Sequence, residues 1–154
     1  NVLVEYIEDA RILDLFAGTG SYSIELLSRG ASLATCIDKS PKAVEVIRKN
    51  VASLGLTGRI RVICGDSIRL IGTMDNGMEN YRIVIVAPPY FAGLDKAAMD
   101  LLGKSRLVEP AGIVVLQQHK KEPHAEAYGN LRLRKTYAYG ETKISTYLVS
   151  QQVQ

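Results

Sequence analysis

Short apolar runs alternate with amphipathic segments through most of the chain. These runs occupy residues 11–16, 33–37, 60–64, 82–86 and 112–117, and most are followed within two residues by glycine, proline or aspartate. A short apolar run bounded in this way is typical of a buried strand. We therefore expect five strands in this part of the sequence.

The segments between the apolar runs carry the signals of helices. Residues 21–29 stop at Gly30, a common helix end, and Ser40–Pro41 provides an N-cap followed by proline in the first turn. A short helix is expected at 67–71, a polar loop at 72–80 and an amphipathic helix at 95–107. The helix that begins after Ser40 has one apolar face, made of Val44, Ile47, Val51 and Leu54.

The pattern changes after Gln117. Residues 131–137 and 143–149 alternate between apolar and polar positions with Gly140 between them, which predicts an antiparallel hairpin. Strands that alternate with helices indicate parallel β-α-β units with right-handed crossovers. We predict a doubly wound, Rossmann-like α/β fold, whose mostly parallel, seven-stranded sheet ends in this C-terminal hairpin. No linker or repeat divides the sequence, so a single domain is expected over residues 1–154.

Composition narrows the classes of function only slightly. Hydrophobic residues make up 47% of the chain and the net charge is +3, with a pI near 8.9. This mildly basic balance is compatible with a nucleic-acid partner without indicating one. No apolar run approaches the roughly 20 residues of a membrane helix, and no signal-peptide pattern opens the chain. We expect a cytoplasmic protein without a membrane partner.

The cysteine and histidine positions favour neither a disulfide nor a metal site. Cys36 and Cys64 lie within apolar runs, each two residues before an aspartate, and we expect reduced core thiols that are neighbours on one face of the sheet. His119 and His124 have no further cysteine or histidine partners nearby. An exposed pair in a loop, with no bound metal, is the expectation for these histidines.

The segment Asp-Leu-Phe-Ala-Gly-Thr-Gly at 14–20 follows the first strand and opens the first helix. Glycines in this position let the backbone approach a ligand, although a tight structural turn has the same signature. Asp14 would repel a diphosphate and suits a ligand with an ammonium and a sulfonium, so S-adenosyl-L-methionine (SAM) is favoured over a dinucleotide. The cofactor-binding residues expected in this loop are Asp14, Phe16, Ala17, Gly18, Thr19 and Gly20.

Two further aspartates close the second and third strands. Asp38 comes 20 residues after Gly18, where an acidic side chain commonly accepts hydrogen bonds from ribose hydroxyls, and Asp66 closes the next strand. Each aspartate alone has a second interpretation as a helix cap. Because the ends of parallel strands meet at one edge of the sheet, we expect Asp38 with Lys39, and Asp66 with Ser67, to bind the cofactor.

The end of the fourth strand carries Ala87-Pro88-Pro89-Tyr90. Two prolines hold the chain extended and fix the direction of the first proline's carbonyl, and the aromatic ring that follows can stack on a flat base. A strand that simply ends in proline before a surface tyrosine is the alternative. On the first interpretation, these four residues are the expected catalytic loop.

These motifs together resemble the bacterial small-subunit ribosomal RNA guanine-N2 methyltransferases, the RsmD family. The resemblance rests on the loop at 14–20, Glu25, Ser-Arg-Gly at 28–30, Ala-Pro-Pro-Tyr at 87–90 and the ending Tyr-Gly-Glu-Thr-Lys-Ile-Ser-Thr-Tyr at 139–147. It covers nearly the whole chain. Members of that family carry a longer segment before the first strand that helps to grip RNA, and most of it is absent from this sequence.

The resemblance implies a class I methyltransferase that binds SAM over its first two strands and releases S-adenosyl-L-homocysteine (SAH). It assigns the methionine end to Asp14, Gly18 and Gly20, the ribose to Asp38, and the adenine to Asp66 and Ser67. It also implies that the loop at 88–90 holds the target guanine, flipped from its stack or taken from an unpaired region.

Ala87 departs from the family pattern, which has aspartate or asparagine before Pro-Pro-Tyr. The amine of a base is a poor nucleophile because its lone pair is delocalised, and an acceptor on its N–H groups stabilises the charge that develops during transfer. Alanine supplies no acceptor, which leaves the carbonyl of Pro88 alone. We expect weakened methyl transfer, at a cost of roughly 10- to 100-fold in rate.

Basic residues crowd the last third of the chain. A solvated surface explains them, and so does a phosphate-binding patch beside the catalytic loop with Tyr137 and Tyr139 interleaved. The residues expected to contact RNA are Lys120, Lys121, Arg132, Arg134 and Lys135, with Lys143 nearby.

The leading expectation is SAM-dependent methylation of the guanine N2 amine in ribosomal RNA. Its partner would be naked RNA or an assembling small ribosomal subunit, and the chain is expected to act as a monomer. Methylation of adenine N6 in DNA or RNA uses the same Pro-Pro-Tyr chemistry and is the second enzyme class. The alternative without catalysis is a SAM- or RNA-binding domain that lost turnover with Ala87, and a dehydrogenase is the outlying class.

Overall fold

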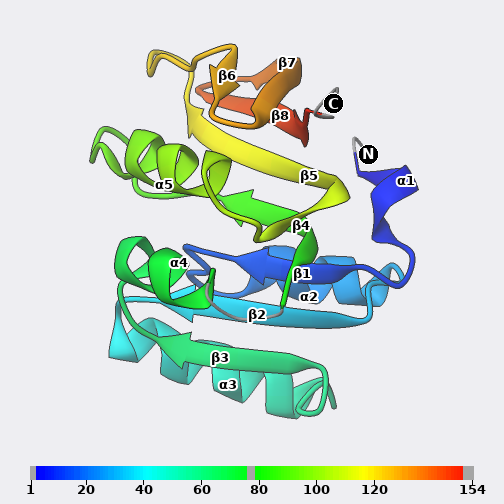
Figure 1. The fold of residues 1–154 in the computed structure, drawn as a ribbon. Coiled ribbons are helices and arrows are strands. Elements are labelled where there is room, and N and C mark those ends of the chain that lie inside the picture. Colours follow the sequence, from blue (N-terminus) through cyan, green and yellow to red (C-terminus); the bar gives the residue numbers. More distant parts are fainter. Residues whose placement is uncertain (1–2, 76–78, 151–154) are drawn as a thin grey trace.

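The computed structural model describes residues 3–75 and 79–150, so part of the polar loop expected at 72–80 lies outside the described residues. Helices and strands alternate as expected through the first two thirds of the chain (Figure 1). The helices are α1 (Val4–Ile7), α2 (Ser21–Ser28), α3 (Pro41–Ser53), α4 (Ser67–Met74) and α5 (Leu94–Gly103). The strands are β1 (Arg11–Asp14), β2 (Leu33–Asp38), β3 (Ile60–Cys64), β4 (Tyr81–Val86), β5 (Val108–His119), β6 (Ala127–Tyr128), β7 (Leu131–Tyr139) and β8 (Thr142–Val149).

The described strands form one mixed sheet in the order β3-β2-β1-β4-β5-β8-β7-β6. The pairs from β3 to β5 are parallel, whereas β8, β7 and β6 follow in antiparallel pairs. The doubly wound fold and the C-terminal hairpin are therefore confirmed. The sheet has eight strands and not seven, because Ala127–Tyr128 pairs with the start of β7. Two residues are too short to show a strand pattern in the sequence.

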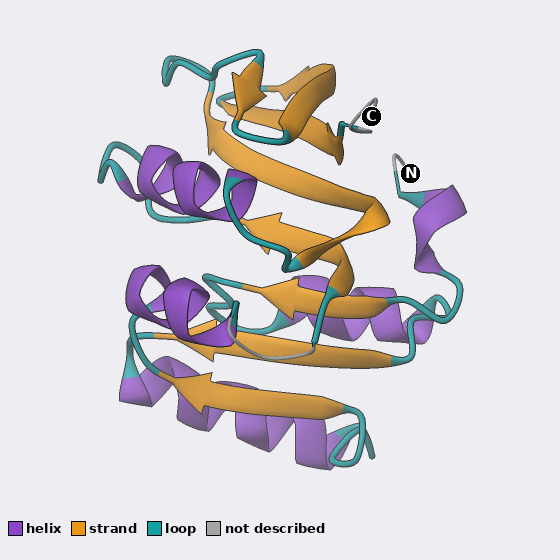
Figure 2. Ribbon diagram, viewed as in Figure 1, coloured by secondary structure: helices purple, strands orange, loops and turns teal. Residues whose placement is uncertain are grey.

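Helices cover both faces of the parallel part of the sheet, α2 and α3 on one side and α4 and α5 on the other (Figure 2). Each face has its own apolar core. Leu26 of α2 and Ile47 of α3 belong to the first core with Ile12 of β1, while Met99 of α5 packs in the second core with Leu13. Because neighbouring residues of a strand point to opposite faces, a continuously apolar strand such as β1 serves both cores.

Several element boundaries differ from expectation. Helix α5 ends at Gly103 and β5 begins at Val108, so the expected helix at 95–107 is too long and the strand expected at 112–117 is too short. The short helix α1 was not expected. Leu54 is 57% exposed because α3 ends before it, so this residue does not extend the buried face of the helix.

The two cysteines are both free, as expected. Cys36 is buried in β2, but Cys64 is exposed, so the expectation of two core thiols is wrong for Cys64. In the register of β2 and β3, Cys36 pairs with Val62 and Cys64 pairs with Asp38, so the two cysteines are not opposite each other. Cys64 lies at the end of the edge strand, where one side of the chain meets solvent.

Among the described residues, no helix combines the length and the apolar character that crossing a membrane requires.

Candidate functional site

The carboxyl ends of β1 to β4 border a cleft with a volume of about 760 Å³. The arrowheads of these strands point to the same edge of the sheet in Figure 1. Residues from the glycine loop, from the ends of β2 and β3 and from the loop after β4 all line this cleft, together with the start of α5. They are Phe16, Gly18, Asp38, Lys39, Asp66, Ser67, Ile68, Ala87, Pro88, Pro89, Tyr90, Leu94 and Ala97. The structure therefore brings most of the expected site residues together.

The glycine loop is tied to the end of β2 by Asp38. One carboxylate oxygen of Asp38 accepts a hydrogen bond from the Gly18 N–H at 2.8 Å, and the other accepts from the Ser40 N–H at 2.9 Å. Gly18 and Gly20 both have positive φ, and a Cβ on Gly20 would lie 3.2 Å from Ile47. Glycine at position 20 thus lets the loop turn while α3 packs close beneath it.

Asp14 lies behind the loop and outside the residues that line the cleft. Its carboxyl group is 1% exposed and accepts a hydrogen bond from the Ser23 hydroxyl at 2.9 Å. Burial raises the pKa of Asp14 to about 7, while the hydrogen bond from Ser23 lowers it and the charge of Asp38 raises it further. Burial therefore favours the neutral form of the group that was expected to meet a cation.

Ala17 and Thr19 also lie outside the cleft lining. The Ala17 N–H donates to the Ile37 carbonyl at 2.9 Å. The hydroxyl groups of Thr19 and Ser21 are hydrogen-bonded to each other at 2.6 Å. These contacts join the loop to β2 and to the first turn of α2. Both residues hold the shape of the loop in the structure.

Asp66 and Ser67 combine a structural contact with a place in the cleft. Asp66 caps α4 by accepting from the Ile68 N–H at 2.9 Å, and the hydroxyl of Ser67 donates to the Leu15 carbonyl. Both side chains also line the cleft. The helix-cap interpretation of Asp66 is thus correct, and it does not conflict with a position beside a ligand.

The loop after β4, residues 87–91, forms one wall of the cleft and is called the acceptor loop below. Pro88 is buried, whereas Tyr90 is 40% exposed. The Tyr90 hydroxyl is 2.9 Å from the hydroxyl of Thr142, and the ring of His119 approaches the Tyr90 ring edge-on at 5.5 Å. The start of β8 and the end of β5 therefore fix the direction of the tyrosine.

Ala87 has polar neighbours that sequence reasoning missed. Val86 pairs with Leu116 in the parallel register, so Ala87 and Gln117 come next on the two strands. Gln117 accepts a hydrogen bond from the hydroxyl of Tyr22 on α2. Burial, with Asp14 and Tyr90 nearby, raises the pKa of Tyr22, so its hydroxyl keeps its proton. Only the register of β4 and β5 places these groups beside position 87.

The expectation that His119 belongs to an exposed loop pair is wrong. His119 ends β5, its side chain is largely buried, and its Nε2 atom is 3.0 Å from a carboxylate oxygen of Glu141. Its ring centroid lies 5.0 Å from that of Phe91. His124 is half-buried, with its Nε2 atom 3.3 Å from the Thr136 hydroxyl.

Glu122 is another residue of the site that the sequence did not reveal. Its side chain is buried, and its two carboxylate oxygens accept from the Phe91 N–H at 3.0 Å and from the His119 N–H at 2.8 Å. The carboxylate thus connects the acceptor loop to the end of β5. In the sequence this residue belongs to the run His-Lys-Lys-Glu, which has the pattern of a charged surface, so no local signal identifies it.

The basic residues expected to contact RNA do not form one patch. Lys120 and Lys121 are exposed next to His119, at the cleft edge of the sheet, and Lys120 pairs with Glu141 at 3.1 Å. Arg132 lies far along β7, because it pairs with Leu148 and that residue pairs with Ile113. The other two basic residues follow on the same strand: Arg134 is 3.7 Å from Glu5, and Lys135 lies over the ring of Tyr137.

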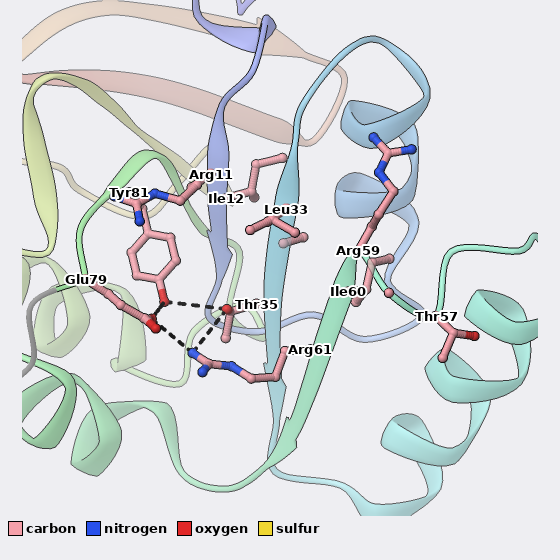
Figure 3. Close-up of a pocket in the computed structure, with 12 residues that line it drawn as sticks. Arg11, Ile12, Leu33, Thr35, Thr57, Arg59, Ile60, Arg61, Glu79 and Tyr81 are labelled. Carbon is pink, nitrogen blue, oxygen red and sulfur yellow. Dashed lines mark hydrogen bonds and ion pairs between the residues drawn. The ribbon is translucent and has the colours of Figure 1, made fainter.

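A second cavity, of about 420 Å³, lies toward the amino ends of β1, β2 and β3 (Figure 3). Four of its polar residues are bound to one another: the Tyr81 hydroxyl donates to Glu79 at 2.8 Å, and Arg61 donates to Glu79 at 3.1 Å and to Thr35 at 3.4 Å. Ligands of open α/β sheets bind at the other edge, where the strands end. The cleft at the carboxyl ends is therefore the candidate site.

Comparison with known proteins finds relatives in sequence and in structure. Ribosomal RNA small subunit methyltransferase D of Escherichia coli (strain K12) is 28% identical over 147 residues, which are 96% of this chain and 72% of that protein. A conserved hypothetical protein of Streptococcus pyogenes has a similar structure, with a TM-score of 0.82, 29% identity, and coverage of 92% of this chain and 86% of that one.

A SAM-dependent methyltransferase of Agrobacterium tumefaciens shares the fold at a TM-score of 0.69 and 18% identity, over 96% of this chain and 61% of that chain. The expected methyltransferase fold is thus confirmed, as is the resemblance to RsmD. The model of the family described as Conserved hypothetical protein 95 matches residues 1–148. With this match over nearly its whole length, the chain belongs to that family.

Proposed function

We propose that this chain is a SAM-dependent methyltransferase that modifies ribosomal RNA, and that it transfers the methyl group to the exocyclic N2 amine of a guanine in the small subunit. The observation that carries the proposal is the cleft itself. One wall is a glycine loop held by Asp38, and the facing wall is a Pro-Pro-Tyr loop held by Thr142. Such a cleft can hold a nucleoside cofactor against a flat base.

The residues of the cleft fit SAM. Both carboxylate oxygens of Asp38 accept main-chain N–H groups, and each keeps a second lone pair for a ribose hydroxyl. Phe16 and Ile68 provide apolar surface for an adenine, and Asp66 and Ser67 add polar groups beside it. Asp14 lies behind the loop, where a bound ammonium would favour its ionised form. When bound, SAM supplies a methyl group on a positively charged sulfur and leaves as SAH.

The acceptor loop positions the amine. The prolines fix the main chain so that the Pro88 carbonyl can accept an amine N–H, while Tyr90 offers its ring for stacking. As the nitrogen–carbon bond forms, the carbon–sulfur bond breaks, and the amine then loses one proton to water. Holding the two reactants together supplies much of the rate acceleration.

Two observations support an RNA partner. The Escherichia coli relative is named as a ribosomal RNA methyltransferase, and the exposed Lys120 and Lys121 lie at the edge of the cleft. Lys120 and Lys121 can reach phosphates beside the acceptor loop. Action as a monomer in the cytoplasm, on free ribosomal RNA or an assembling small subunit, belongs to the same proposal.

Calorimetric titration with SAM, SAH and NAD tests the cofactor. We expect saturable binding of SAM and SAH and none of NAD. Asp38→Ala should weaken SAM binding, whereas Glu45→Ala, which removes an exposed carboxylate that pairs with Lys49 on α3, should not. Binding of NAD without SAM would contradict the proposal and support a dehydrogenase.

Transfer of a labelled methyl group to unmodified small-subunit ribosomal RNA tests the substrate. Digestion of the product should yield labelled N2-methylguanosine. Labelled N6-methyladenosine would instead support the adenine enzyme, whose chemistry the same Pro-Pro-Tyr loop allows. SAM binding without any transfer would support the non-catalytic alternative that Ala87 suggests.

A further inference from the structure

Phe91 follows the acceptor loop's tyrosine in an unusual conformation. It has φ +59°, which non-glycine residues rarely adopt, and its side chain is 66% exposed. A large aromatic ring in solvent and a backbone in the left-handed region each cost free energy. Because both costs fall on one residue beside the cleft, we infer that Phe91 has a role in binding.

The surrounding residues hold Phe91 in this conformation. Its N–H donates to the buried carboxylate of Glu122 at 3.0 Å, and its ring lies against that of His119. Glu122 is fixed in turn, because its second oxygen accepts from the His119 N–H and its carbonyl accepts from Lys143. The ring is therefore presented by a rigid support and not by a mobile loop.

The acceptor loop separates two cavities. Tyr90 lines the candidate cleft, whereas Phe91 lines a neighbouring cavity of about 510 Å³ on its other side. Lys121 and Lys96, of which Lys96 also pairs with Asp100 at 2.6 Å, border this neighbouring cavity and can meet a phosphate. Its two carboxylates are turned toward the protein: Glu122 binds main-chain N–H groups, and Asp95 accepts from the Gln118 amide at 2.7 Å.

We propose that Phe91 is a stacking platform for the nucleotide adjacent to the target base. That nucleotide occupies the neighbouring cavity lined by Phe91, while the target base occupies the cleft. The inference rests on the proposed function, since it requires a nucleic-acid strand at the acceptor loop. Consecutive bases that are splayed apart and stacked on separate aromatic rings are a common arrangement in the recognition of single-stranded RNA. The phosphates on either side of the nucleotide stacked on Phe91 would form ion pairs with Lys96 and Lys121.

A binding cycle between Phe91 and the neighbouring base tests the platform. The probe is the short RNA UUAGAUU with a fluorescent end label, together with two versions that carry an abasic site on one or the other side of the guanosine. Binding is measured by fluorescence anisotropy with saturating SAH, so that no turnover occurs. For the wild type, one abasic version should bind roughly 5- to 150-fold more weakly than the intact RNA.

Phe91→Asn removes the ring but keeps a residue that tolerates positive φ, so the loop conformation is preserved. In this variant the same abasic site should change affinity less than about twofold. Phe91→Tyr should behave as the wild type does. Leu54→Ala, which removes another exposed apolar side chain at the end of α3, is the matched control and should leave all three affinities unchanged.

The proposal would be wrong if the abasic site reduced RNA affinity equally in the wild type and in Phe91→Asn. It would also be wrong if the wild type failed to bind the intact RNA. Failure of the proposed function is a separate result. It would be seen as the absence of methyl transfer to ribosomal RNA, while the binding cycle with SAH still decides whether Phe91 stacks on a neighbouring base.

Discussion

Asp14 places a carboxyl group at the end of β1 with almost no access to water. Burial raises its pKa from 3.8 to about 7, so this group changes charge near physiological pH. If the ionised form receives the ammonium of SAM, affinity for SAM should increase as pH rises through about 7. Below that pH it should fall about tenfold per unit. Calorimetric titration between pH 5.5 and 8.5 measures this dependence.

Asp14→Asn is the control for that titration, because asparagine can still accept the Ser23 hydrogen bond without titrating. Its affinity for SAM should be low and nearly independent of pH. The free energy of unfolding has the opposite dependence on pH. The pKa of Asp14 is higher in the folded state than in the unfolded chain, so protonation of Asp14 at low pH favours folding. That advantage is lost as pH rises through about 7. A pH-independent affinity in the wild type would remove Asp14 from the cofactor site.

Ala87 supplies no side-chain oxygen to the acceptor loop, where the resemblance to RsmD leads us to expect aspartate or asparagine. Ala87→Asp should raise the turnover number for RNA by roughly 10- to 100-fold, because a carboxylate can accept from the amine as charge develops on it. Affinity for SAM should stay the same. Single-turnover kinetics with labelled SAM separate the chemical step from binding.

Ala87→Leu is the matched variant for this experiment, since it fills the same half-buried space without an acceptor and should not accelerate transfer. Unchanged turnover in Ala87→Asp would show that the amine needs no acceptor from this position. In that case the neighbouring pair of Gln117 and Tyr22 would be the polar group to test next.

At the scale of elements, the sequence predicted what depends on local pattern. Strands buried on both faces and the cap at Ser40 carry their signals within a few residues. The five expected strands and the cap were all found, although β5 is longer and β1 shorter than expected. The end of α5 was misplaced because the apolar spacing continues to Leu107, although the helix ends at Gly103. What ends the helix there is a contact distant in sequence, which no local pattern contains.

Gly103 shows this contact. A Cβ at this position would lie 2.0 Å from the Tyr128 carbonyl, so the end of α5 approaches the backbone of β6 too closely for any side chain. Gly103→Ala should lower the free energy of unfolding by about 3 kcal/mol or more, because main chain has to move on both sides. Urea denaturation followed by circular dichroism measures the change.

Gly72 in α4 offers a matched comparison, since a Cβ there would meet nothing within 4 Å and the residue does not need positive φ. Gly72→Ala should raise stability by about 0.5–1 kcal/mol. If both substitutions had the same small effect, the close approach between α5 and β6 would not constrain the fold.

At the scale of the whole molecule, the residues of the candidate site fall into two groups: those whose grouping could be predicted from the sequence and those whose grouping could not. The grouping of the glycine loop, Asp38 and Asp66 in one cleft was predictable, because each lies at or just after the end of a strand and parallel strands end at one edge. Their role toward a cofactor stays a prediction. The supports of the acceptor loop were not predictable. His119 ends β5 and Glu122 lies just after it, whereas Thr142 reaches the loop because the antiparallel strand β8 folds back beside β5. A charged run in a sequence does not show which member becomes buried.

The same folding divides the basic residues into two groups. Lys120 and Lys121 follow the end of β5 at the cleft, whereas Arg132 lies level with Ile113, six residues before His119, or roughly 20 Å away at about 3.3 Å per residue. A short RNA held at the acceptor loop therefore meets the lysines before it comes near Arg132. A ribosomal RNA can span both groups.

This division has a measurable consequence for the dependence of RNA binding on salt. Replacing Lys120 and Lys121 by glutamine should weaken binding of UUAGAUU and reduce the logarithmic salt slope by about 0.7 for each phosphate that the variant no longer neutralises. Replacing Arg132 and Arg134 by glutamine should reduce that slope less for the short RNA than the lysine variant does, and should reduce it clearly for the full ribosomal RNA. Anisotropy measured across a series of salt concentrations gives both slopes. If the arginine variant weakened the short RNA as strongly as the lysine variant, RNA would have to follow a different path across the sheet.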